Sequence, residues 1–415
     1  MDKGERGHRL RGSRQPPSDK GKGVRFAGID IAAEKHFVAV LDEQRVVLVK
    51  PTAFAEDAAG HAKLLDLLGP PGDLLVAMEA TGHYWRNVFA SLAATGHTVA
   101  LLNPLRTSRF AGEDLQRTKT DAIDAVSIAR FAAEKRPVPT RVPDTATQEL
   151  RELVRLRDRL MQDLGDRVRQ LHRVVDLGFP EFTRHVRTLD SELATAILHE
   201  YPTAEAFLGL PWKRLAKLCY DGRHKVGEEI AKGLVETAKV SVGRHHGPAY
   251  RTQVRFACED IDLLRRRLRE LDADIERTLG DHEVGSLLTS IDGIGPTTAA
   301  RLVAEFGDIA AFPDAAALAA YVGCVPGLRQ SGKRLATRAG LTPHGNARLR
   351  TKLWMPTLTA VRKNAWLRAY YEGLRARAKL PKVALVASMR KLLVAVHCVA
   401  KNRKPFVPIL AEVPA

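Results

Sequence analysis

The first third of the chain alternates short apolar runs with amphipathic ones. Apolar runs bounded by Gly, Asp or Asn predict strands, whereas apolar spacings of three and four predict helices. The predicted order is three strands that can form hairpins, then helix, strand, helix, strand and helix, over residues 24–32, 36–41, 46–50, 53–68, 74–82, 84–94 and 98–102, with the last helix starting at 121. This order predicts a mixed sheet with helices on its faces.

Four carboxylates follow these elements. Asp30 and Glu79 lie near the ends of two apolar strands, and Asp121 and Asp124 lie three residues apart at the start of the last helix, which Thr120 is suited to cap. This pair points one way and either complements the helix dipole or holds a cation. Four hard oxygen ligands suit magnesium, or manganese, for cutting a phosphodiester. The order of these acids resembles that of the ribonuclease H-like fold of RuvC type.

The middle of the chain predicts two long helices. Prolines at 137, 139 and 143 break the preceding pattern, and residues 146–175 and 250–279 carry apolar side chains at coiled-coil spacing. The helices can fold back on each other or on a partner subunit, and residues 178–247 between them predict short helices without a motif. The first helix has a polar face that fits either a nucleic-acid contact or a solvated surface, with Arg151, Arg155, Arg157, Arg159, Arg167, Arg169 and Arg173 beside Glu152, Asp158, Asp163 and Asp166.

Two glycines follow, at Gly293 and Gly295, in the sequence Asp-Gly-Ile-Gly-Pro-Thr-Thr. A helix, a Gly-Ile-Gly turn and a second helix resemble the helix-hairpin-helix module. In that module the backbone N–H groups of the turn bind a phosphate of the nucleic-acid backbone, which positions the protein without reading sequence. The alternative is an ordinary turn between helices.

A glycine- and arginine-rich segment lies further on. Ser331 stands in Arg-Gln-Ser-Gly-Lys-Arg, which predicts an open loop whose cations would surround a phosphate. A serine there needs a base, a metal or an arginine to become a nucleophile. A second basic turn, Gly-Asn-Ala-Arg-Leu-Arg, follows at 345–350. The candidates for phosphate contacts are Arg329, Lys333, Arg334, Arg348 and Arg350, with His344 and Asn346 beside them.

The positive charge is concentrated near the C-terminus. The whole chain of 415 residues has a formal net charge of +17, and residues 333–404 contain 18 Lys and Arg with Glu372 as the one acid. This segment also carries enough leucine and valine for a folded core. A folded, nearly acid-free domain predicts binding to nucleic-acid phosphates.

The remaining composition excludes several classes. The four cysteines are scattered, which excludes a cysteine-based zinc module and indicates a reducing cytoplasm. We expect no membrane-spanning segment, because no run of about 18 apolar residues is apparent. The polar, basic N-terminus lacks the apolar core of a signal peptide and predicts a disordered arm.

Taken together, the motifs resemble the IS110 family of insertion-sequence transposases. The resemblance covers residues 25–406 and rests on Gly-Ile-Asp30, Met-Glu79-Ala-Thr-Gly, Lys-Thr-Asp121-Ala-Ile-Asp124, the Gly293-Ile-Gly295 turn and Gln-Ser331-Gly with the basic turn after it. It implies that Asp30, Glu79, Asp121 and Asp124 form a RuvC-like magnesium site and that Ser331 is the nucleophile that becomes linked to DNA. It further implies a tetramer in which one subunit's acids meet another's serine, and a structured noncoding bridge RNA that pairs with donor and target DNA.

We therefore expect an α/β domain followed by all-α parts. The expected division is a basic arm at 1–23, a RuvC-like domain at 24–140, coiled-coil helices at 145–283 with the helical insertion 178–247, and a C-terminal transposase domain at 284–406. The expected partners are double-stranded DNA and the guide RNA, in a homodimer or tetramer near the nucleoid. Two alternatives remain: a RuvC-type structure-specific endonuclease that uses water, and a noncatalytic nucleic-acid-binding protein.

Overall fold

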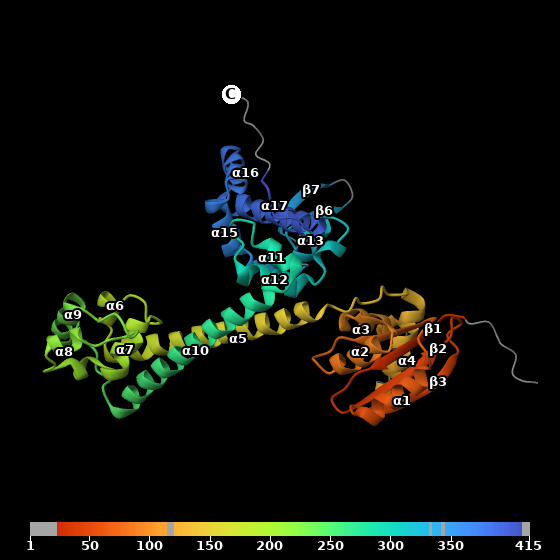
Figure 1. Cartoon of the computed structure of the whole chain (residues 1–415), viewed down its shortest axis with the longest axis horizontal. Helices are drawn as coiled ribbons and strands as arrows, with labels where there is room; N and C mark the ends of the chain where they lie inside the picture. Colours follow the sequence, from red (N-terminus) through yellow and green to blue (C-terminus); the bar gives the residue numbers. More distant parts are fainter. Residues whose placement is uncertain (1–22, 114–119, 332–333, 342–344, 409–415) are drawn as a thin grey trace, which may run out of the picture. The chain divides into compact units, whose positions relative to one another are not determined.

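The computed structural model describes residues 23–113, 120–331, 334–341 and 345–408. Within these, the chain separates into two compact units, residues 1–142 and 143–415. Each unit has its own hydrophobic cores (Figure 1).

The first unit is a five-stranded mixed sheet covered by helices. Its strands lie in the order β3-β2-β1-β4-β5, with β1, β2 and β3 antiparallel and β1, β4 and β5 parallel. This confirms the predicted mixed sheet. The elements are β1 Arg25–Asp30, β2 Lys35–Leu41, β3 Val47–Ala55, α1 Ala58–Leu68, β4 Leu74–Glu79, α2 Trp85–Ala94, β5 Thr98–Leu102, α3 Pro104–Glu113 and α4 Asp121–Lys135.

The two faces of this sheet bury different side chains. Ile29 and Met78 belong to the core shared with α1 and α2, whereas Phe26 and Ala77 pack with α3 and α4. Because successive strand residues point to opposite faces, the inner strands are apolar on both sides. The central strands β1 and β4 are therefore fixed in register by two cores at once.

One predicted boundary in this unit was wrong. The sequence predicted a helix from residue 53, but β3 continues to Ala55 and α1 begins only at Ala58. Phe54 is buried and pairs in register with His36 of β2, so strand pairing overrides the local helical pattern. Asp57 then caps α1, accepting a hydrogen bond of 2.7 Å from the backbone N–H of Gly60.

The second unit is mostly helical, as predicted. Its two longest helices, α5 and α10, lie side by side, and a core of short helices packs on them near the C-terminal end of α5 (Figure 1). The elements of this part are α5 Thr145–Gly178, α6 Phe182–His185, α7 Glu192–Glu200, the 3₁₀ turn Ala204–Phe207, α8 Trp212–Ala216, α9 Glu228–Lys239 and α10 Pro248–Gly280. The two long helices thus pack on each other within one chain.

A second core of this unit joins the first half of α5 to the C-terminal elements. These elements are α11 Glu283–Leu288, α12 Pro296–Phe306, the 3₁₀ turn Ile309–Ala311, α13 Ala315–Val322, β6 Pro326–Ser331, β7 Arg334–Leu341, α14 Ala347–Lys352, α15 Trp354–Lys363, α16 Ala365–Ala376 and α17 Pro381–Asn402. The hairpin of β6 and β7 was not predicted.

The helix α17 also corrects an expectation. It is long and apolar enough to cross a membrane by length and composition, which the sequence analysis did not recognise. However, 61% of its most apolar window is buried inside the protein, where Leu392, Leu393 and Val396 belong to the core formed by the first half of α5 and the C-terminal elements. The helix is apolar because it is the centre of this core.

Candidate active site and nucleic-acid interface

Asp30 and Glu79 end two neighbouring parallel strands. Ile29 of β1 pairs in register with Met78 of β4, so the two acids that follow lie next to each other at the same edge of the sheet. Both are partly buried. By strand alternation they point to the face that carries Phe26 and Ala77, which is the face that α4 covers.

The helix α4 approaches this face unusually closely at Gly28. A Cβ atom at Gly28 would lie 2.2 Å from the carbonyl oxygen of Ala125 and 2.3 Å from the backbone nitrogen of Ala129. Only glycine leaves room for a helix backbone at that distance. This contact places the middle of α4 directly against the middle of β1.

The direction of α4 determines which end of β1 its first turn lies near. Arg136, immediately after the helix, lies 5.9 Å over the ring of Phe26 near the start of β1, while Gly28 further along the strand meets Ala125. The helix α4 therefore runs antiparallel to β1, and its N-terminal turn lies toward the end of the strand that carries Asp30. Asp121 and Asp124 occupy that turn, which Thr120 caps as predicted by accepting from the N–H of Ile123 at 3.3 Å.

Glu79 is held by hydroxyl groups that sequence reasoning missed. The hydroxyl of Thr107, in α3, donates to one carboxylate oxygen at 2.6 Å, and the hydroxyl of Thr81 donates to the other at 3.4 Å. Thr107 is itself buried. Nothing in the sequence near Thr107 signals this role, because the contact depends on how α3 packs beside β4.

These four acids have the oxygen chemistry that magnesium or manganese prefers. In the part of the chain that the structure describes, no three His, Cys, Asp or Glu side chains lie close enough together to share a metal ion. The fold therefore brings the acids to one edge of the sheet without closing a coordination shell around a common point.

Ser331 is the last residue of β6, not part of an open loop as the sequence predicted. It pairs in register with Arg334 of β7, and Arg329 pairs with Thr337. The prediction was wrong because residues 326–341 lack a clear apolar alternation, so strand pairing here was not visible in the pattern. Lys333, also a predicted phosphate contact, lies outside the described residues.

The two ends of this hairpin meet at their base. Gly345, with φ at +106°, approaches Gly323 so closely that a Cβ would lie 2.6 Å from the nitrogen of Gly323. The N–H of Asn346 also donates to the carbonyl of Tyr321 at 2.7 Å. The start of α14 is thus fixed beside the base of this hairpin, and Ser331 lies at the other end of β6.

Two residues of the basic turn have structural partners. Asn346 caps α14 through the N–H of Leu349 at 2.9 Å and donates to Glu305 at 3.0 Å. Arg350 donates to the carbonyl of Val322 at 3.1 Å. Both side chains therefore stabilise the base of the hairpin.

Arg348 belongs to a charged cluster around Asp158 of α5. Asp158 accepts from Arg301 at 2.7 and 2.8 Å, from Arg348 at 2.9 Å and from Lys352 at 3.1 Å. Burial alone would raise the pKa of Asp158, but the hydrogen bonds and charges of its cationic partners, Arg301 foremost, hold that pKa well below its usual range. Of the two alternatives for the polar face of α5, the solvated surface does not hold at Asp158, because only 6% of this residue is exposed.

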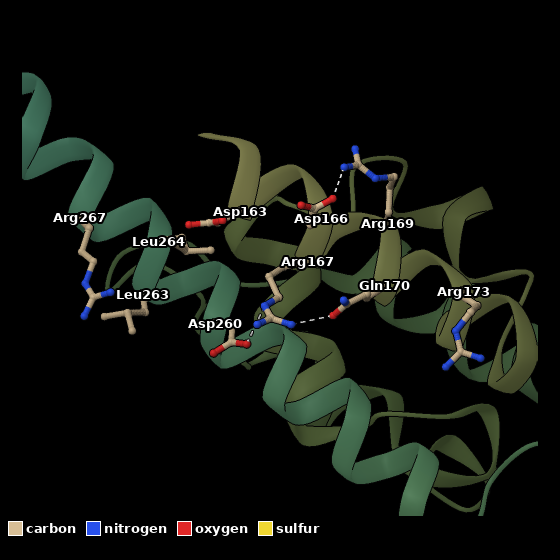
Figure 2. Close-up of a pocket in the computed structure, with 10 residues that line it drawn as sticks. All are labelled: Asp163, Asp166, Arg167, Arg169, Gln170, Arg173, Asp260, Leu263, Leu264 and Arg267. Atoms are coloured by element: carbon tan, nitrogen blue, oxygen red, sulfur yellow. Dashed lines mark hydrogen bonds and ion pairs between the residues drawn. The ribbon is translucent and has the colours of Figure 1, made fainter. Parts of the chain in front are cut away.

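Some of the other arginines of α5 pair across to α10, and others pair within α5. Arg157 binds Asp272 at 2.5 and 3.1 Å. A groove of about 620 Å³ lies along the two helices, and within it Arg167 pairs with Asp260 at 3.0 Å. Figure 2 shows the side chains that line it, with Arg167 directed at Asp260 and Arg169 at Asp166. These pairs favour a structural role for this part of the arginine face.

The two glycines of the predicted hairpin module differ. Gly293 has φ at +100°, and a Cβ there would lie 2.5 Å from the Cα of Ala360 in α15, so close packing requires this glycine. Gly295 caps α12, and nothing lies within 4 Å of where its Cβ would be. Of the two, Gly295 is the one with open space beside its backbone.

Comparison with known proteins agrees with these features. The model of the DEDD transposase domain of IS110 matches residues 27–180, and the model described as "Transposase IS116/IS110/IS902 family" matches residues 285–372. The two matches include all four acids and Ser331.

Full-length relatives align over most of the chain. It is 26% identical to the 44.8 kDa protein of insertion element IS116 from Streptomyces clavuligerus, over 92% of this chain and 96% of the relative. It is 29% identical to the mini-circle putative transposase for IS117 from Streptomyces coelicolor, over 74% and 78%. It is 24% identical to the pilin gene-inverting protein of Moraxella bovis, over 80% and 82%. The chain therefore belongs to the IS116/IS110/IS902 family of transposases and is an enzyme that acts on DNA.

Proposed function

We propose that this transposase cuts and rejoins DNA through a covalent link to Ser331, with a divalent metal ion held by Asp30, Glu79, Asp121 and Asp124. The observation that carries the proposal is that Asp30 and Glu79 end neighbouring parallel strands, while the first turn of α4, which contains Asp121 and Asp124, lies toward the same edge of the sheet. A ribonuclease H-like fold of RuvC type accounts for this arrangement of strands and acids.

The four acids are the proposed ligands of the metal ion. When bound, magnesium or manganese would neutralise the charge that develops on the scissile phosphate. Thr107 and Thr81 orient Glu79 by donating to its two carboxylate oxygens at 2.6 and 3.4 Å, as groups around a metal ligand commonly do. Gly28 permits the close approach of α4 that brings Asp121 and Asp124 to the same edge.

The proposed covalent step conserves the phosphodiester energy. The hydroxyl oxygen of Ser331 bonds to phosphorus, its proton passes to a basic group or solvent, and the bond from phosphorus to the leaving strand's oxygen breaks. The oxygen of the leaving strand takes up a proton from solvent and departs as a free hydroxyl. A hydroxyl of the new partner strand then attacks the phosphoserine and releases the serine, so rejoining needs no external energy source.

A guide RNA is the proposed source of sequence specificity. In the described part of residues 333–404, Arg348, Lys352 and Arg403 pair with carboxylates, so most of the positive charge there is not neutralised by acids. Such a surface suits backbone phosphates, while base pairing would select the target. The open backbone at Gly295 fits the phosphate contact of a helix-hairpin-helix. We further propose a tetramer with composite sites, acting at the nucleoid.

The test is a search for a protein–DNA adduct on a denaturing gel. The full chain is incubated with the RNA that flanks its gene, with donor and target DNA, and with magnesium. We expect an adduct that mass spectrometry places on Ser331 and that is lost in Ser331→Ala and in Asp30→Asn. The exposed Ser286 of α11 provides a matched serine control, and Asp66 of α1, on the opposite face of the sheet, provides a matched carboxylate control.

Each outcome separates the candidate functions. Cleavage without an adduct, retained in Ser331→Ala, would identify a hydrolytic nuclease of RuvC type. Binding with neither cleavage nor exchange would identify a noncatalytic protein. Omitting the RNA tests guidance, because a guided enzyme loses its choice of target without it.

A further inference from the structure

The charged cluster around Asp158 contains more cations than its acid can balance. Arg301 is buried with Asp158 and binds both carboxylate oxygens, which already makes a neutral bidentate pair. Arg348 and Lys352 then add two further cations to the same carboxylate. Glu305 is the next acid, 4.0 Å from the Nε of Arg348, and it also accepts from Asn346.

The surplus charge faces solvent. The side chain of Arg348 is 48% exposed and that of Lys352 is 39% exposed, whereas Asp158 and Arg301 are each 6% exposed. Arg348 and Lys352 each pair with a different oxygen of the Asp158 carboxylate. They are four residues apart in sequence, which places them on the same face of α14. The positive charges of Arg348 and Lys352 repel each other at this distance, so an anion bound on the solvent-exposed side of the two side chains would be stabilised.

The cluster also lies at a defined place in the fold. The helix α14 starts at Ala347, directly after the Gly323–Gly345 contact and the Asn346–Tyr321 hydrogen bond that close the base of the β6–β7 hairpin. The two cations therefore lie near the base of the hairpin, and Ser331 lies at the opposite end of β6, next to the hairpin turn. Arg350 and Asn346, which the same motif contributes, are already bound to protein groups.

We propose that Arg348 and Lys352 form a binding site for one or two backbone phosphates of a nucleic acid. Asp158 holds the two side chains in position by pairing with both of them. Arg348 supplies a planar fork that fits two phosphate oxygens, and Lys352 supplies a point charge. Sequence patterns did not single out Lys352. The inference deepens the proposed function, because it identifies how the chain would hold nucleic acid next to the serine hairpin.

Salt dependence provides the test. Each phosphate contact contributes about 0.9 to the slope of log affinity against log salt concentration for duplex DNA, and about 0.7 for single strands. Fluorescence anisotropy is measured with a short DNA duplex and with a single-stranded RNA of equal length, from low to moderate salt. For Arg348→Gln/Lys352→Gln we expect the slope to fall by about 0.9–1.8 if duplex DNA occupies the site, or by about 0.7–1.4 if the RNA does, for one or two bound phosphates.

Two matched variants serve as controls. Lys217→Gln/Lys239→Gln removes the same charge from exposed positions in the helical insertion, and its slope should stay near that of the unmodified chain. Arg348→Lys/Lys352→Arg keeps both charges and should keep the slope. If the double variant does not fold, Lys352→Gln alone, at a partly exposed side chain, should lower the slope by about 1.

The outcomes show which nucleic acid occupies the site, and they are independent of the proposed serine mechanism. If the salt-dependence slope falls with DNA alone, the site binds donor or target DNA. If it falls with RNA alone, the site binds the guide RNA. Unchanged slopes with both nucleic acids would overturn the proposal and leave the cluster with a role in stability alone. Ser331→Ala is expected to keep the full slope, so failure of the serine mechanism does not affect this binding test.

Discussion

Asp158 of α5 and Arg301 of α12 form a buried bidentate ion pair, with oxygen–nitrogen distances of 2.7 and 2.8 Å. An arginine cannot lose its charge in a protein, so the burial of Arg301 depends on this one carboxylate. The pair ties the long helix α5 to the C-terminal core, and Arg348 and Lys352 extend it to α14.

Breaking this pair should destabilise the second unit. We expect Asp158→Asn to lower the free energy of unfolding by about 3–5 kcal/mol, because it leaves the guanidinium of Arg301 buried without a counter-charge. Urea denaturation followed by circular dichroism measures the change. Asp166→Asn is the matched control, since its pair with Arg169 is exposed and should contribute at most about 1 kcal/mol. Equal losses in the two variants would contradict the assignment.

The same carboxylate predicts a dependence on pH. Because the pKa of Asp158 is lowered in the folded state, its contribution to stability is fully present above its ordinary pKa of about 3.9 and is lost as pH falls toward the folded value. The difference in unfolding free energy between the unmodified chain and Asp158→Asn should therefore narrow between pH 5 and pH 2. Urea titrations at several pH values measure it. A difference that stays constant over this range would show that the carboxylate charge does not stabilise the fold.

Gly28 should tolerate no side chain. A methyl group at this position meets the backbone of α4 at 2.2 Å, so we expect Gly28→Ala to cost about 1–3 kcal/mol or more and to displace the helix that carries Asp121 and Asp124. Thermal denaturation measures the cost, and isothermal titration with manganese measures the effect on the acids. Gly23→Ala is the control, because nothing lies within 4 Å of its Cβ position. Native stability in Gly28→Ala would argue against the close approach of α4.

The two glycines near α12 should respond in opposite ways. Gly293→Ala forces a methyl group against Ala360 at a positive φ, so we expect a loss of stability of about 1–3 kcal/mol. Gly295→Ala meets no protein atom, so stability should be unchanged while a phosphate is hindered from reaching the backbone. Melting curves and DNA anisotropy measured on both variants separate packing from binding. Unchanged DNA affinity in Gly295→Ala would remove the phosphate contact from that turn.

Local patterns predicted the elements that are fixed by burial on a regular period. The apolar strands ending at Asp30 and Glu79, the cap at Thr120 and the two long helices depend on neighbours in sequence, so their positions are close to those expected. Side-chain spacing also placed Asp121 and Asp124 on one face of a helix. The charge of residues 333–404 is likewise a property of composition alone.

Tertiary structure decided everything that depends on partners distant in sequence. β3 extends to Ala55 because Phe54 pairs with β2, Ser331 lies in a strand because residues 334–341 pair with it, and α17 is apolar because other helices surround it. Asp158 looked like one of several surface acids, yet packing buried it with Arg301 across 143 positions of sequence. The sequence by itself determined the elements, the acids and the charge, because these follow from local spacing and residue type. Only the fold decided which of these groups meet, because contacts between remote residues follow from packing and not from spacing.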